Sequence, residues 1–139
     1  LPACVTAWCH GAPGIGLARI GMLPYYDTSE IRQEIRIATE TTLAQGTGHN
    51  HSLCHGGLGN LELVLQAIPH IPEVRQQYGQ CLTEIVHRMD LGEYICGVPL
   101  GVTTPGLMTG LAGIGYQLLR FADPDKIPSV LTLQPPIMG

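Results

Sequence analysis

The chain has 139 residues, a length suited to one domain or to part of a larger one. Its 45% of hydrophobic residues are enough to form a buried core, which argues against intrinsic disorder. Only 13% of the residues are charged, with 7 Lys and Arg against 11 Asp and Glu, so no nucleic-acid partner is expected. Five cysteines without secretory features indicate reduced thiols and a cytoplasmic location rather than a disulfide framework.

The uncharged stretch from Tyr94 to Leu119 has the length needed to cross a bilayer. Two prolines, Pro99 and Pro105, and several glycines interrupt it, so we expect buried protein backbone there and no membrane span. The chain begins at Leu1 rather than at Met and has no polar leader. We therefore expect it to be a piece of a longer protein.

One glycine-rich pattern occurs three times along the chain. The copies occupy residues 11–18, 56–61 and 110–117. They can be aligned on the glycines Gly16, Gly59 and Gly115, and each copy is uncharged and followed by an apolar run. Such a repeat predicts one structural unit used three times.

The segments between the copies predict helices of two kinds. Residues 30–45 carry apolar side chains every three or four positions, with Ser29 as the expected N-cap, and residues 73–89 after Pro72 follow the same amphipathic pattern. The runs after the second and third glycine copies, 58–68 and 107–121, are apolar nearly all round, so we expect these helices to be buried on all sides.

These elements predict an all-α fold made of helical hairpins. Each unit would pair an inner apolar helix with an outer amphipathic one, with a glycine-rich turn where the inner helix begins. A strand-like pattern is nearly absent and is confined to residues 129–133. The loops 46–51 and 92–104 are long enough to carry function.

A Cys-His pair stands just before the first two glycine turns, as Cys9-His10 and Cys54-His55. At the N-terminus of a helix, the helix dipole and free N–H groups favour a thiolate. Two thiolates and one imidazole, from Cys9, Cys54 and His55, suit Zn²⁺ with an open fourth position. Since no C-x-x-C pair is present and a buried Cys is more often a packing residue, simple packing remains open as an alternative.

The remaining cysteines are expected to be core residues: Cys4, Cys81 and Cys96. His10 is placed to line the same pocket as an acid or a base. His49 and His51 form a second candidate metal pair, although loop histidines of this kind are more often exposed. His70 and His87 are expected at helix ends or on the surface.

Three segments together resemble the LanC-like family of lanthionine synthetase cyclases: residues 8–19, 52–60 and 105–116. The tail, residues 118–131, is similar to the C-terminus of the bifunctional LanM enzymes of class II lanthipeptide synthesis. The resemblance runs over nearly the whole chain and rests on three ordered motifs. It implies that residues 1–139 are the C-terminal fragment of a LanC-like domain.

The resemblance implies an α/α toroid of helical hairpins, of which this chain would form the last three or so. It implies a zinc site with Cys9, Cys54 and His55 as ligands. It also implies a reaction: an upstream dehydratase domain makes dehydroalanine or dehydrobutyrine in a precursor peptide with a leader. The cyclase then adds a peptide Cys thiolate to that residue. His10 is the candidate acid, and without the other hairpins we expect weak zinc binding and no activity.

Two other functions remain open at this point. A non-catalytic LanC-like protein would use the same pocket to bind a peptide or glutathione. A plain scaffold of helical hairpins would only bury its cysteines, and it would bind no metal.

Overall fold

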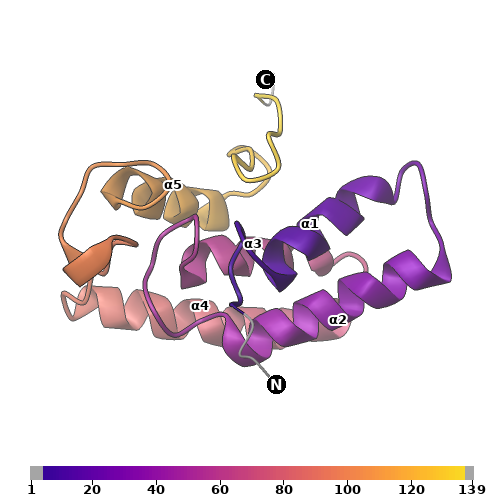
Figure 1. Cartoon of the computed structure of the whole chain (residues 1–139), viewed down its shortest axis with the longest axis horizontal. Coiled ribbons are helices and arrows are strands. Elements are labelled where there is room, and N and C mark those ends of the chain that lie inside the picture. Colours follow the sequence, from indigo (N-terminus) through magenta and orange to yellow (C-terminus); the bar gives the residue numbers. More distant parts are fainter. Residues whose placement is uncertain (1–4, 137–139) are drawn as a thin grey trace.

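The computed structural model describes residues 5–136 (Figure 1). This part of the chain contains five α-helices: α1 (Ala12–Met22), α2 (Ser29–Gln45), α3 (Gly57–Ala67), α4 (Arg75–Asp90) and α5 (Leu111–Ala122). Two single 3₁₀ turns precede α4 and α5, at Pro72–Val74 and Pro99–Gly101. Residues 5–136 form no β-strand beyond an isolated bridge between Ala7 and His10, so the all-α prediction is confirmed.

The helices form hairpins of an inner and an outer helix, as the repeat predicts. Helix α1 packs on α2, α3 packs on α4, and α3 also contacts α1 and α2. The outer helices α2 and α4 run along the lower edge of Figure 1, with α1, α3 and α5 above them. Helix α5 packs on α3 and begins a third unit, but residues 123–136 after it form turns instead of a second helix.

Burial differs between the two inner helices that were expected to be covered on all sides. In α3, Leu58, Leu61 and Val64 have no exposed surface, so the prediction is confirmed there. In α5, Leu111 is 43% exposed and Leu119 is 62% exposed, so the prediction is wrong for this helix. The reason is that no outer helix packs beside α5 in the described part of the chain.

Three local predictions are corrected by the backbone. The N-cap of α2 is Thr28 rather than Ser29, because the Thr28 hydroxyl accepts a hydrogen bond from the Ile31 N–H at 3.3 Å. The second outer helix begins at Arg75, since Pro72–Val74 forms a separate tight turn. The strand-like segment 129–133 is also a turn, closed by a hydrogen bond from the Gln134 N–H to the Ser129 carbonyl at 3.0 Å.

The structural repeat has a different register from the one that the glycines suggest. Gly11, Gly56 and Gly110 are the N-caps of the inner helices. Three residues later, a second glycine lies against the preceding loop. A Cβ atom would lie 2.1 Å from the Trp8 carbonyl oxygen at Gly14, 1.8 Å from that of Leu53 at Gly59 and 1.7 Å from that of Leu107 at Gly113. The alignment on Gly16, Gly59 and Gly115 is therefore wrong by two residues in the first and third copies.

Candidate metal centre

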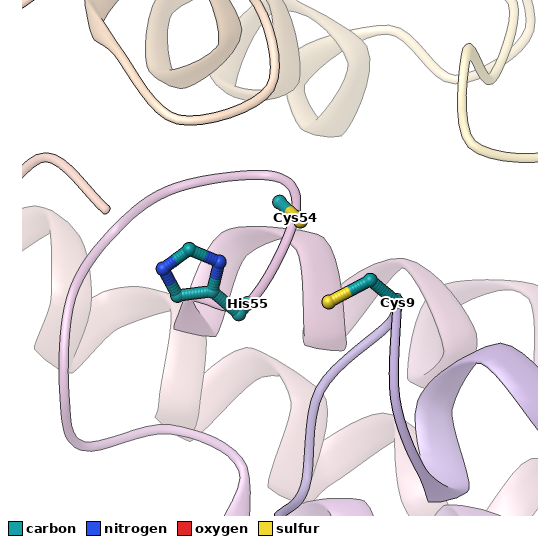
Figure 2. Close-up of side chains that lie close together, drawn as sticks. All are labelled: Cys9, Cys54 and His55. Atoms are coloured by element: carbon teal, nitrogen blue, oxygen red, sulfur yellow. The ribbon is translucent and has the colours of Figure 1, made fainter. Parts of the chain in front are cut away.

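Two cysteines and one histidine meet at the point where the first two inner helices begin (Figure 2). The sulfur atoms of Cys9 and Cys54 and a ring nitrogen of His55 all lie within 4.8 Å of one another. Among residues 5–136, no other group of three potential metal ligands comes together in this way. The structure thus joins the three side chains that the Cys-His repeat singles out, and no such group of three in residues 5–136 includes His49 or His51.

Backbone hydrogen bonds between the loops bring the ligands together. The Cys9 N–H donates to the Cys54 carbonyl at 3.2 Å, and the Cys54 N–H donates to the Met108 carbonyl at 2.8 Å. Met108 stands two residues before the N-cap Gly110 of α5, which is the position that the cysteines hold before α1 and α3. The three loops therefore lie side by side, but the third provides a thioether where the first two provide thiols.

The imidazole of His55 has a defined orientation. Figure 2 shows that the ring nitrogen facing the cysteines is Nδ1, the nitrogen bonded to the ring carbon that is attached to Cβ. The other nitrogen, Nε2, lies near Gly97, because a Cβ atom on Gly97 would come within 2.9 Å of it. Nδ1 of His55 is therefore the ring atom available to a metal shared with Cys9 and Cys54.

The thiols of the cluster differ in environment. Cys9 is exposed, whereas Cys54 and His55 are half-buried. Burial raises the pKa of Cys54 to about 11, and the neighbouring Cys9 acts in the same direction. Burial thus opposes the thiolate form of Cys54 that the N-terminus of α3 favours. Two thiols and an imidazole nevertheless match the donor set that Zn²⁺ prefers, since a metal ion replaces the thiol protons.

His10 lies next to this group but not in it. Its side chain is exposed, and its backbone N–H donates to the Ala7 carbonyl at 3.2 Å. A cavity of about 820 Å³ opens beside the cluster, between α1 and the turn after α5. Cys9, Trp8 and Gln66 line it together with Leu131, whereas His10, which was predicted to line the pocket at the metal, is not among its lining residues. A molecule held in this cavity has direct access to Cys9.

The prediction that His51 is exposed is wrong. His51 is 5% exposed, and its ring Nδ1 accepts a hydrogen bond from the N–H of Ile95, in the loop before α5. No local sequence signal identifies this contact, because Ile95 is distant in the chain. His49, His70 and His87 are exposed, as expected.

The cysteines outside the cluster behave as packing residues. Cys96 is buried in the main hydrophobic core, and half-buried Cys81 packs against that core, so both expectations are confirmed. Cys4 lies outside the described residues.

None of the helices in residues 5–136 has the length and apolar character that crossing a membrane requires.

Comparison with known proteins places this geometry in a family. The family model described as lanthionine synthetase C-like protein matches residues 3–132. The lacticin 481/lactococcin biosynthesis protein LcnDR2 of Lactococcus lactis subsp. lactis is 29% identical over 131 residues, which cover 83% of this chain and 14% of that protein. The chain thus spans a small part of this relative's length. From the family match, the chain belongs to the lanthionine synthetase C-like proteins.

Proposed function

We propose that this chain carries the zinc site of a lanthionine cyclase. The enzyme would add a Cys thiolate of a precursor peptide to a dehydroalanine or dehydrobutyrine residue of the same peptide, which closes a thioether ring. The observation that carries the proposal is the cluster of Cys9, Cys54 and His55, with ligand atoms within 4.8 Å, in a LanC-like chain. The relative's name, which refers to lacticin 481 biosynthesis, supports the same class of reaction.

Cys9, Cys54 and His55 would hold Zn²⁺, which when bound supplies a positive charge that lowers the pKa of a substrate thiol. A free Cys thiol has a pKa near 8.5, so only a small fraction is thiolate at pH 7. The chain's own residues would provide the place for the reaction. The cavity beside Cys9 would hold the peptide, and the half-buried position of Cys54 and His55 would limit the access of water.

Addition to the double bond also requires a proton. The substrate sulfur forms a bond to the β-carbon, and the electron pair of the carbon–carbon double bond moves to the α-carbon and its carbonyl. The resulting enolate takes up a proton at the α-carbon. His10 would donate it, because His10 is exposed and follows Cys9 directly in the chain, and an imidazole can serve as a general acid.

The wider partners belong to the same proposal. A precursor peptide with a leader would be the substrate, and a dehydratase domain outside these 139 residues would prepare it. The remaining hairpins of the cyclase domain would complete the site. All of these would operate in the cytoplasm, where free thiols such as Cys9 and Cys54 persist.

The test compares metal content with ring formation in the full-length protein. We expect about one zinc per chain in the unmodified protein and in Cys81→Ser, the matched control, and almost none in Cys54→Ser. Alkylation of free thiols followed by mass spectrometry counts the cysteines that remain unreacted in a dehydrated precursor peptide. Cys54→Ser should leave them free. Retained zinc and ring formation in Cys54→Ser would refute the proposal. If the unmodified protein binds zinc but forms no ring, a non-catalytic peptide- or glutathione-binding protein is favoured instead.

A further inference from the structure

The loop before α5 is tied to the loop that carries the candidate ligands. The His51 backbone N–H donates to the Ile95 carbonyl at 2.8 Å, and the Ile95 N–H donates to Nδ1 of the His51 ring at 3.0 Å. His51 itself is buried. The two hydrogen bonds fix residue 95 beside residue 51, three positions before Cys54.

Two residues further on, Gly97 is held from its other side. Its N–H donates to the Thr109 carbonyl at 2.7 Å, next to the N-cap of α5. The backbone at Gly97 is therefore anchored both through Ile95 and through the third glycine loop. Neither anchor involves the metal cluster itself.

Gly97 touches the candidate ligand His55 directly. A Cβ atom on Gly97 would lie 2.4 Å from the Ser52 hydroxyl oxygen and 2.9 Å from Nε2 of His55, distances that real Cβ atoms do not show. The φ angle of Gly97 lies outside the left-handed region, so the requirement for glycine here is one of space and not of backbone conformation. Any larger residue would push the ring of His55 or the side chain of Ser52 away.

We propose that Gly97 and His51 are positioning residues for His55. The Nε2 edge of the ring rests on Gly97, which leaves Nδ1 facing the cysteines, and His51 keeps Gly97 in place through Ile95. The inference rests on the metal site proposed above. Ligands held before the metal arrives bind it more tightly, and changes in the residues that orient a ligand commonly weaken metal affinity by about 10- to 100-fold.

The test uses Co²⁺ as a spectroscopic probe added to the metal-free, full-length protein. Gly97→Ala should weaken Co²⁺ binding by about 10-fold or more and shift the visible absorption bands, because the nitrogen ligand is displaced. The matched control is Gly48→Ala, since Gly48 has open space around its Cβ position and no positive φ. The thermal midpoint of each metal-free variant, measured in parallel, separates loss of the site from loss of the fold.

His51 is tested by a pair of substitutions. His51→Leu removes the acceptor for the Ile95 N–H and should weaken Co²⁺ binding, whereas His51→Asn keeps an acceptor at that position and should restore much of it. His49→Leu, an exposed neighbour in the same loop, is the control and should bind Co²⁺ as the unmodified protein does. If His51→Leu fails to fold, Gly97→Ala decides the outcome alone.

Unchanged Co²⁺ affinity and bands in Gly97→Ala would overturn the inference. So would a loss of affinity in Gly97→Ala that Gly48→Ala shares, because that would be a general loss of stability. If the unmodified protein binds Co²⁺, Cys54→Ser does not and Gly97→Ala still does, the proposed metal site stands and only the role of Gly97 and His51 fails. An unmodified protein that takes up no Co²⁺ overturns both.

Discussion

Glu62 of α3 and Arg120 of α5 form an ion pair at 2.9 Å, with side chains that are 0% and 5% exposed. Gln66 and Gln117 each donate a hydrogen bond of 2.6 Å to the Glu62 carboxylate. Arg120 also donates to the carbonyl of Pro124, in the turn after α5. This buried group links the second and third inner helices to the chain segment that forms one wall of the cavity beside Cys9.

Removing one partner of this pair should be costly. Arg120→Met leaves the Glu62 carboxylate buried without a countercharge, and we expect the free energy of unfolding to fall by about 3–5 kcal/mol. Urea denaturation followed by circular dichroism measures it. The control is Arg36→Met, because Arg36 pairs with Glu73 on the surface and such pairs contribute about 1 kcal/mol or less. Equal losses of unfolding free energy in the two variants would show that the buried pair contributes no more to stability than the surface pair does.

The close packing of Gly59, three residues after the N-cap Gly56 of α3, predicts a loss of stability with a different cause. In Gly59→Ala the new Cβ would lie 1.8 Å from the Leu53 carbonyl oxygen, so the loop before α3 must move. We expect a loss of about 1–3 kcal/mol in stability, seen as a lower thermal midpoint. Cys54 follows Leu53 directly, so metal binding should weaken as well.

Gly115→Ala provides the comparison for Gly59→Ala. Gly115 lies within α5 with open space around its Cβ position, and alanine is the better helix former. This variant should keep or raise the thermal midpoint. If the thermal midpoint falls equally in Gly59→Ala and Gly115→Ala, the contact with the Leu53 carbonyl is not the cause of the loss.

His51 should make stability depend on pH. Burial lowers the pKa of His51 below its usual value, the charge of Arg88 acts in the same direction, and Glu93 opposes them. As the pH falls through about 6.5, the unfolded chain takes up a proton that the folded His51 does not, so stability decreases until the pH passes the lower, folded pKa. His51→Asn should therefore show a smaller loss of unfolding free energy between about pH 7.5 and 5.5. A loss equal to that of the unmodified protein would exclude this role.

His10 should affect the reaction without affecting the metal. His10→Gln removes the proposed proton donor but none of the three candidate ligands, so zinc content should be unchanged. The rate of ring formation should fall by about 10²- to 10⁴-fold, the range typical of a lost general acid. Thiol alkylation over time measures that rate in the full-length protein, with His49→Gln as the control. Loss of zinc in His10→Gln would instead make His10 part of the metal site.

The sequence alone predicts the helices and the three candidate ligands. The amphipathic spacing of residues 30–45 and 73–89 identifies the outer helices to within a few residues, because helical hydrogen bonds join positions close together in the chain. Cys9, Cys54 and His55 were identifiable because the repeat places Cys-His pairs before equivalent glycine turns, and equivalent turns of stacked hairpins are neighbours.

Only the tertiary structure decided how the site is supported. The burial of His51, the contact of Gly97 with His55 and the exposed face of α5 depend on which distant segments pack together. The register of the repeat likewise depends on the contact between Gly59 and the Leu53 carbonyl rather than on the spacing of glycines. The periodicity of apolar residues in the sequence indicates which face of a helix is buried. Which segment a loop packs against depends instead on hydrogen bonds and close contacts between residues far apart in the chain, and these form only when the chain folds.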